Sequence, residues 1–179
     1  MLESIRKTVG IIISRVHFRS RQDEVVSFSR SLSNARHALL IMPFRSVDTA
    51  PVTPLLNLMR QRLQERHITV ITPMHSVELM HLLPQGKFIR IEESDISPFF
   101  IPKPGMMQRM PRSEYDLAID LNLDFVLPSG YICRESKAKI RIGFASDRSE
   151  LFYNFVLRLP PVGGRHQIYE RLTACLAMF

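Results

Sequence analysis

The sequence predicts an α/β protein built around a mostly parallel β-sheet. Short β-rich runs alternate with helical stretches from Ala38 onward, which is the pattern of repeated strand–helix–strand units. The 179 residues suit one compact domain with a short appendage, and 45% hydrophobic with 23% charged residues is an ordinary globular composition. We therefore expect one domain over residues 37–179, preceded by an extension over residues 1–36.

The extension is basic and predicts an amphipathic helix. It holds seven basic and three acidic residues, a net charge of +4 out of +7 for the whole chain. At 100° per residue, six apolar side chains fall within an arc of about 100°, and basic residues lie outside it. The apolar positions are Leu2, Ile5, Val9, Ile12, Ile13 and Val16, and the basic ones are Arg6, Lys7 and Arg15. Ile11 and Phe18 fall on the polar side and break the pattern.

Two uses of this apolar stripe stay open. It can enter an anionic membrane surface or dock on a membrane complex, with an apolar gain on the order of 5 kcal/mol and about 1 kcal/mol more per nearby cation. Alternatively, the stripe packs on the sheet or on another subunit. No apolar run is long enough to cross a bilayer, and two isolated cysteines indicate neither a disulfide framework nor a zinc site. We expect a cytoplasmic protein, peripheral to the inner face of the cytoplasmic membrane.

The domain is predicted to contain about five strands with helices on both faces of the sheet, a Rossmann-like arrangement. The strands are predicted at Ala38–Met42, Ile68–Thr72, Phe88–Ile91, Leu117–Asp120 and Ile140–Phe144. Helices are predicted at Thr53–Arg66, Ser76–Leu83, Leu151–Leu157 and His166–Met178.

Residues 95–112 carry four prolines and one glycine, so they predict a loop over the surface or at a binding edge. Consecutive apolar residues in an exposed loop usually have a partner, and methionine adapts to irregular contacts. We therefore expect Phe99, Phe100, Met106 and Met107 to contact a protein partner.

The domain resembles the N-terminal, acceptor-side half of glycosyltransferase family 9, the lipopolysaccharide heptosyltransferases. Six segments carry the resemblance in order: the first strand with Asp48 six residues before Pro54, then HITVIT at 67–72, YDLAID at 115–120, AKIRIGF at 138–144, LFYN at 151–154 and His166 opening the last helix. The resemblance implies that Asp48 stands where the family has its general base.

Three departures from the family pattern predict that transfer is lost. Val47 replaces the family's glycine before Asp48. Residues 121–128 form an acidic, apolar stretch, whereas the family usually has a basic residue here that suits an anionic acceptor. The family holds its donor sugar nucleotide mainly in a C-terminal half, so we expect the donor site to be absent from this chain. Asp48 would then be a turn or helix-capping residue.

The remaining charged residues predict little chemistry of their own. Lys137, Lys139 and Arg141 alternate along a strand if it begins early, and with His166 they are candidates for anion binding. Asp116 and Asp120 are about 13 Å apart on a strand, too far for one glycosidic centre, and are interpreted as loop anchors. The histidines have no metal-ligand spacing, so we expect neither a metal nor a cofactor.

Our leading hypothesis is a non-catalytic, glycosyltransferase-like subunit that binds a membrane surface or a membrane-protein complex through its basic helix and its Pro/Met/Phe loop. The alternative is an enzyme: an acceptor-binding half that works with a separate donor-binding subunit, with Asp48 as general base. A basic nucleic-acid binder is a third reading, which we do not expect because no recognition motif accompanies the charge.

Overall fold

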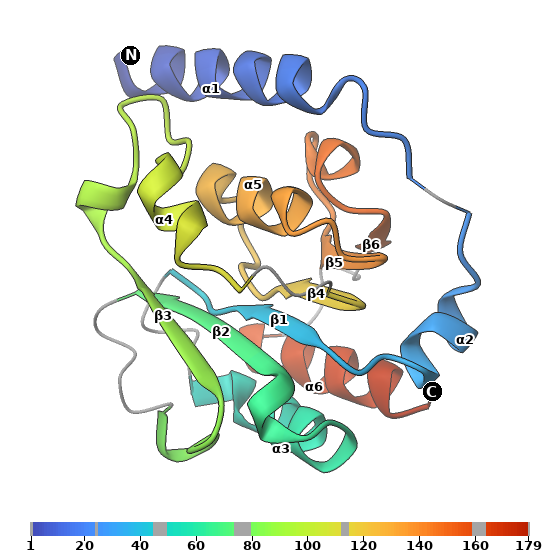
Figure 1. Ribbon diagram of the computed structural model, residues 1–179. Coiled ribbons are helices and arrows are strands. Elements are labelled where there is room, and N and C mark those ends of the chain that lie inside the picture. Colours follow the sequence, from blue (N-terminus) through green and yellow to red (C-terminus); the bar gives the residue numbers. More distant parts are fainter. Residues whose placement is uncertain are drawn as a thin grey trace.

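A computed structural model describes residues 2–23, 25–44, 50–73, 80–111, 115–158 and 164–178. Its centre is a six-stranded sheet in the order β3-β2-β1-β4-β5-β6, with every pair of neighbours parallel (Figure 1). The strands are β1 (Ala38–Ile41), β2 (Ile68–Pro73), β3 (Lys87–Ile91), β4 (Leu117–Asp120), β5 (Ile140–Phe144) and β6 (Phe155–Leu157). The fold is α/β and Rossmann-like, as predicted, with six strands in place of about five.

Alternate side chains of each central strand enter two separate cores. Leu40, Val70 and Ile119 belong to the core on one face, whereas Leu39, Ile71 and Ala118 belong to the core on the other. Strands buried on both faces read as continuous apolar runs, which is why β1, β2, β4 and β5 could be predicted from the sequence.

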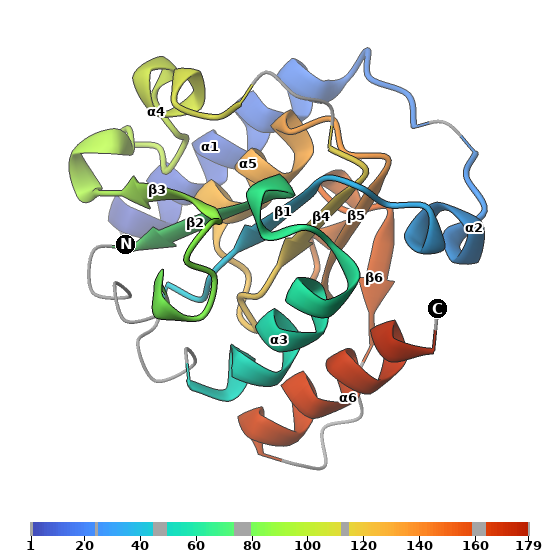
Figure 2. The same ribbon diagram turned by 60° about the horizontal axis from the view of Figure 1, so that its bottom comes forward.

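Helices cover both faces of the sheet (Figures 1 and 2). The long helix α1 (Leu2–Phe18), α4 (Pro104–Gln108) and α5 (Leu127–Glu135) lie on one side, and α3 (Thr53–Arg62) and α6 (Arg165–Ala177) lie on the other. The short helix α2 (Phe28–Ser33) stands beside the β5–β6 end of the sheet, where the ring of Phe28 stacks on Phe155 at 3.9 Å between centroids.

The prediction of a helix at Leu151–Leu157 is wrong. The chain forms one 3-10 turn at Ser149–Leu151 and then the strand β6, which pairs with β5 in the register Ile142–Phe155. Pairing with the open side of β5 satisfies backbone groups that a short helix would have satisfied internally, so the tertiary context overrides the local pattern. The predicted helix at Thr53–Arg66 ends earlier, at Arg62, and 3-10 residues Glu65–His67 follow it.

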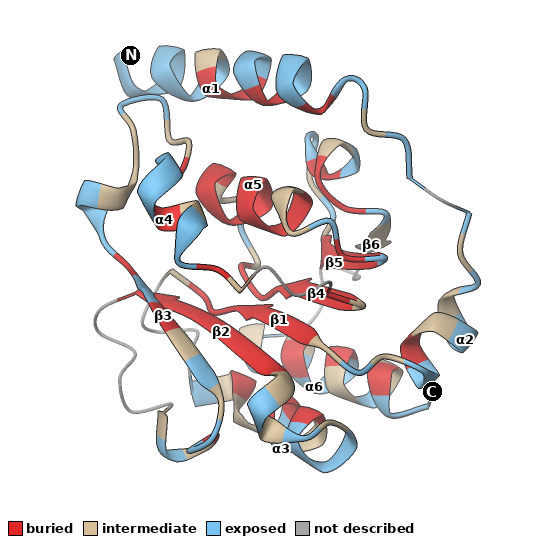
Figure 3. Ribbon diagram, in the orientation of Figure 1, coloured by how far each residue is buried: buried red, intermediate tan, exposed pale blue. Residues whose placement is uncertain are grey.

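The sequence pattern missed α5 entirely. All residues from Leu127 to Arg134 are buried, because the helix lies between the sheet and α1 (Figure 3). A helix that is buried all round has no polar face, and Pro128, Ser129 and Gly130 further weaken its signal. Residues 95–112 contain more order than predicted, with an isolated bridge between Ile96 and Pro102 and the helix α4. Most of the helix predicted at Ser76–Leu83 falls outside the described residues.

Candidate functional site

The inner face of α1 packs on the domain through residues that break its amphipathic pattern. Gly10, Ile11, Ser14 and Phe18 are buried, and the Phe18 ring lies 5.0 Å from that of Tyr131 on α5. A Cβ at Gly10 would overlap the carbonyl oxygen of Phe99, so only glycine lets the helix approach this closely. These four residues therefore set how α1 is turned.

The predicted apolar stripe of α1 faces outward. Its exposed members are Leu2, Ile5, Ile12, Ile13 and Val16, with exposed fractions between 41% and 69%, and Val9 is half-buried. The alternative in which this stripe packs on the chain's own sheet is therefore wrong, because the stripe is exposed and the opposite face of the helix packs on the domain, against α5. Figure 3 shows that the side of α1 turned away from the domain is exposed along the helix, and the large apolar side chains of the stripe belong to this exposed side.

Cations border this stripe. Arg6 falls about 70° from its centre on one side and Arg15 about 110° on the other; both are exposed, as is Arg19, which follows directly after the end of the helix at Phe18. Lys7 points elsewhere, since its ammonium lies 5.5 Å from the Phe125 ring centroid and 3.5 Å from that residue's carbonyl oxygen. The outer face of α1 is thus apolar along its centre and positive along its sides.

The four residues of the Pro/Met/Phe loop that were predicted to contact a partner differ in how far they are buried. Phe99 is exposed beside α1, and Phe100 is half-buried with a left-handed backbone (φ 60°). Met106 is 1% exposed and belongs to the core, so its predicted contact with a partner is wrong. Met107 is half-buried, packs against the same core and borders a pocket. Methionine here mainly fills space under α4.

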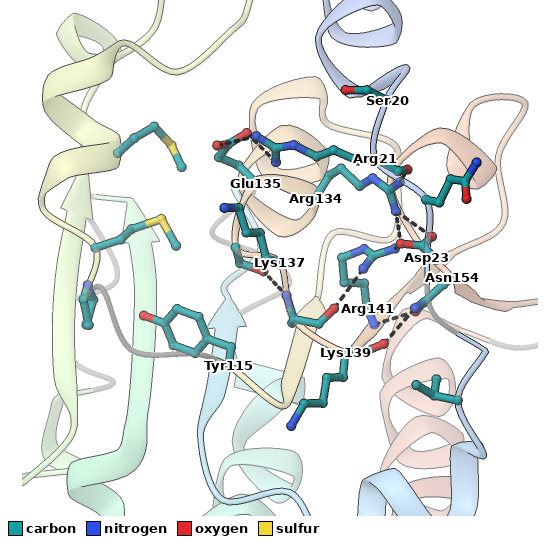
Figure 4. Close-up of a pocket in the computed structure, with 17 residues that line it drawn as sticks. Ser20, Arg21, Asp23, Tyr115, Arg134, Glu135, Lys137, Lys139, Arg141 and Asn154 are labelled. Carbon is teal, nitrogen blue, oxygen red and sulfur yellow. Dashed lines mark hydrogen bonds and ion pairs between the residues drawn. The ribbon is translucent and has the colours of Figure 1, made fainter.

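A basic pocket of about 920 Å³ lies at the amino-terminal edge of β4, β5 and β6. The segment that leaves α1 borders it on one side, and the last turn of α5 and the residues before β5 border it on another (Figure 4). Its described lining includes five cationic and two anionic side chains. They are Arg21, Arg134, Lys137, Lys139 and Arg141, with Asp23 and Glu135.

Two buried guanidinium groups converge on one carboxylate in this pocket. Asp23 Oδ1 lies 2.6 Å from Arg134 Nη1 and 2.6 Å from Arg141 Nη2 (Figure 4). The contact with Arg141 is at ion-pair distance, although the N–H is not aligned for a hydrogen bond. Partial burial would raise the pKa of Asp23, but hydrogen bonding from Arg134 and the positive charges of Arg134 and Arg141 outweigh it and hold this pKa below its ordinary value.

A second ion pair stands at the side of the pocket. Arg21 Nη2 donates to Glu135 Oε1 at 2.9 Å, and His17 Nε2 lies 2.9 Å from Glu135 Oε2. Burial of Glu135 is outweighed by these two partners, so its pKa is lowered. The pocket thereby joins the end of α1 to the end of α5.

The four predicted anion-binding residues do not form one group. Lys137, Lys139 and Arg141 line the basic pocket, but they do not alternate along one strand, because β5 begins only at Ile140 and Lys137 has a left-handed backbone (φ 57°). Lys139 pairs with Asp116 at 2.9 Å. His166 lies on α6 and pairs with Glu170 at 3.2 Å, away from the pocket lining.

The switch point of the sheet, between the carboxyl ends of β1 and β4, holds a buried hydrogen-bond network among its described residues. Tyr153 Oη donates to Asp120 Oδ2 at 2.6 Å, and the amide of Asn122 donates to Asp120 Oδ1 at 2.7 Å. Asn122 Oδ1 in turn accepts from the backbone N–H of Phe44 at 2.8 Å. Burial raises the pKa of Asp120 despite these donors. The interpretation of Asp120 as a loop anchor is confirmed.

Asp116 is also an anchor. Its Oδ2 accepts from the backbone N–H groups of Arg36 and His37 at 2.9 and 3.2 Å. Asp48, the predicted general base, lies outside the described residues together with Val47. The described part of the chain brings no three His, Cys, Asp or Glu side chains together at a distance suitable for a metal ion, and none of its helices is long and apolar enough to cross a membrane.

Asp23, Arg134, Arg21 and Glu135 were not identified from the sequence. An arginine inside the apolar run at 127–135 was a signal, because a charge in a buried segment needs a partner. The partner itself could not be found, since Asp23 is 111 residues away and belongs to the extension.

Comparisons with protein-family models, with curated proteins and with solved structures found no match to this chain. Because a Rossmann-like sheet serves many chemistries, the fold by itself does not identify a family.

Proposed function

We propose that this protein is a non-catalytic, peripheral binding subunit that attaches to an anionic membrane surface through the outer face of α1. The observation that supports the proposal most is the orientation of this helix. Its apolar stripe points away from the domain, while Gly10, Ile11 and Phe18 hold its other face. A stripe needed for the protein's own core would have been buried.

Charge favours a lipid surface as the occupant. Arg6 and Arg15 lie on opposite sides of the stripe, Arg19 follows its end, and Glu3 is the acidic residue of the helix. An interfacial helix with an apolar face and basic sides inserts between anionic headgroups. The apolar part contributes on the order of 5 kcal/mol and each nearby cation about 1 kcal/mol, which suffices for reversible attachment.

The remainder of the domain would present a partner or ligand at that surface. The resemblance to glycosyltransferase family 9 supports a reused acceptor-side half, placed at the inner face of the cytoplasmic membrane.

Vesicle flotation tests the proposal. The wild-type protein should float with phosphatidylcholine vesicles that contain phosphatidylglycerol and remain in solution with phosphatidylcholine alone. Ile12→Glu should lower partitioning at least about tenfold, because it places a charge in the apolar stripe. Met178→Glu is the matched control: Met178 is 75% exposed at the end of α6, so the same kind of change should have no effect.

A second pair of variants separates charge from apolar insertion. Arg6→Gln with Arg19→Gln should weaken binding to the anionic vesicles, whereas Arg90→Gln on β3 should not. Equal flotation of wild-type protein and Ile12→Glu would contradict the proposal. A dimer that forms without vesicles and is lost in Ile12→Glu, measured by light scattering, would assign the stripe to a second copy of the chain instead.

A further inference from the structure

Among the described residues, the basic pocket at the amino edge of the sheet holds more positive charge than its carboxylates balance. Glu135 is occupied by Arg21 and His17, so the guanidinium groups of Arg134 and Arg141 share the carboxylate of Asp23. Both arginine side chains are at least nine-tenths buried, at 10% and 4% exposed. Two buried cations facing one carboxylate leave one positive charge uncompensated among the described residues.

Donor capacity is also left over. Arg134 uses Nη1 for Asp23 and Nη2 for the carbonyl oxygen of Arg21, at 2.7 Å, but its Nε is buried with no hydrogen-bond partner in the described part of the chain. A buried donor without a partner costs about 1–3 kcal/mol. Within the described part of the chain, the guanidinium of Arg134 thus has more donors than acceptors.

Lys137 adds a cation to the pocket at a conformational cost. It follows the last turn of α5 with φ 57°, a position where glycine is the usual residue. Its side chain is exposed at the pocket, unlike those of Arg134 and Arg141. A lysine in this conformation places a mobile ammonium beside the two fixed guanidinium groups.

We propose that this pocket binds a phosphomonoester dianion, whose oxygens take the place of the Asp23 carboxylate between Arg134 and Arg141. A phosphomonoester carries a charge close to −2 at neutral pH and three acceptor oxygens, so it balances both guanidinium groups where a carboxylate balances one. Guanidinium groups bind phosphate oxygens in pairs, and a volume of about 920 Å³ is that of a small-molecule site.

Asp23 acts in this proposal as an internal competitor. Its side chain is 37% exposed and belongs to the segment between α1 and α2, so it can turn toward solvent while Arg134 keeps its hydrogen bond to the carbonyl oxygen of Arg21. Arg141 is held independently of Asp23, because Nε donates to the carbonyl oxygen of Phe152 at 3.1 Å and Nη1 to that of Ala138 at 2.8 Å. The anion site therefore survives the loss of Asp23.

Titration calorimetry with inorganic phosphate and with glycerol 3-phosphate, at constant ionic strength set with chloride, tests this directly. The wild-type protein should bind both saturably. Asp23→Asn should bind them at least about tenfold more tightly, because the ligand no longer displaces a carboxylate. Asp124→Asn removes the same charge at the opposite edge of the sheet, where Asp124 pairs with Arg165, and should leave the affinity unchanged.

Lys137→Gly keeps Asp23 and the fold, and should weaken phosphate binding several-fold. If Asp23→Asn does not fold, the affinity of Lys137→Gly for phosphate, compared with that of the wild-type protein, tests whether the pocket binds the anion. Absence of saturable binding in the wild-type protein and in Asp23→Asn, or equal affinity in Asp23→Asn and Asp124→Asn, would overturn the proposal.

The phosphomonoester can belong to a soluble metabolite or to a lipid headgroup, and two arms of the experiment separate these sources. Vesicles of phosphatidylcholine with phosphatidic acid expose a phosphomonoester, and Ile12→Glu reduces contact through α1. If Asp23→Asn strengthens binding to these vesicles by a larger factor than binding to glycerol 3-phosphate, the ligand is a headgroup; a gain for glycerol 3-phosphate without a gain for the vesicles identifies a soluble one. Phosphate binding that persists in Ile12→Glu shows that this site stands independently of the proposed function.

Discussion

The two edges of the sheet handle buried polar groups in opposite ways. At the carboxyl edge, Asp120 accepts from Tyr153 and Asn122 in a network whose described members satisfy one another. At the amino edge, Arg134 and Arg141 share Asp23 and retain an unsatisfied donor. Open α/β sheets usually bind ligands at the carboxyl edge. In the described part of this chain, the surplus charge and the pocket lie at the other one.

This difference teaches that a buried charge marks structure or function according to whether its partners complete it. Burial raises the pKa of Asp120, whereas cationic and backbone partners outweigh burial and lower the pKa values of Asp23 and Asp116. A complete network contributes stability, and an incomplete one leaves room for a ligand.

The largest effect is expected where the complete network is broken. Asp120→Ala should lower the free energy of unfolding by about 3 kcal/mol, because it orphans the hydroxyl of Tyr153 and the amide of Asn122 in a buried site. Urea unfolding measures it. Asp124→Ala, at an exposed position four residues further on, should change stability by less than about 0.5 kcal/mol, and a similar loss in both variants would contradict the comparison.

Gly143→Ala tests the hydrogen-bond network at the carboxyl edge by changing the packing around Tyr153. A Cβ at this position would lie 2.5 Å from the ring of Tyr153, so the ring must move and its bond to Asp120 must lengthen. We expect a loss of about 2 kcal/mol by urea unfolding. Gly105→Ala is the matched control, since a Cβ there has nothing within 4 Å and should be neutral or slightly stabilising. Equal effects would show that Tyr153 can be displaced without cost.

The two edges should also titrate in opposite senses. The lowered pKa of Asp116 means that its contribution is present above the ordinary value near 3.8 and is lost as the pH falls through the folded-state pKa. The raised pKa of Asp120 has the reverse sign, so its contribution is greatest below 3.8 and declines as the pH rises through the folded-state pKa. Asp116→Asn should therefore cost about 1 kcal/mol at pH 7 and much less at pH 3.

The free energy of unfolding of Asp116→Asn and of the wild-type protein, measured between pH 3 and pH 7, gives the sign of this pH dependence. Asp120→Asn is the counterpart, and its stability relative to wild type should improve as the pH rises. If the stability of both variants relative to wild type changed with pH in the same direction, the two edges would not differ in the way their carboxylates titrate.

The smallest effect is expected at Lys137. Lys137→Gly should raise the free energy of unfolding by about 0.5–1 kcal/mol, because glycine adopts the left-handed conformation without strain. Thermal unfolding measures the gain. A gain in stability together with weaker phosphate binding would show that Lys137 lowers the stability of the fold while its positive charge contributes to binding. Destabilisation by this variant would instead mean that the lysine side chain supports the fold.

Much of the fold could be predicted because strand burial leaves a direct trace in the sequence. Leu117–Asp120 and Ile140–Phe144 have the predicted bounds, since strands buried on both faces are short apolar runs between polar residues. The start of α3 at Thr53 could also be predicted, because the signal, Pro54 in the first turn, lies in the local sequence. The helix α5 and the strand β6 could not be predicted, because their surroundings and not their own patterns select them.

The candidate site divides in the same way. The residues of the apolar stripe on α1 could be found from the sequence, as could the basic residues around β5. The sequence by itself determined that α1 has one apolar face and that the domain is α/β, because periodicity is a property of the local chain. Only the tertiary structure decided which face of α1 is buried and that Asp23 meets Arg134 and Arg141. Close approach at Gly10 and ion pairing across 111 residues depend on surfaces that exist only once the chain has folded.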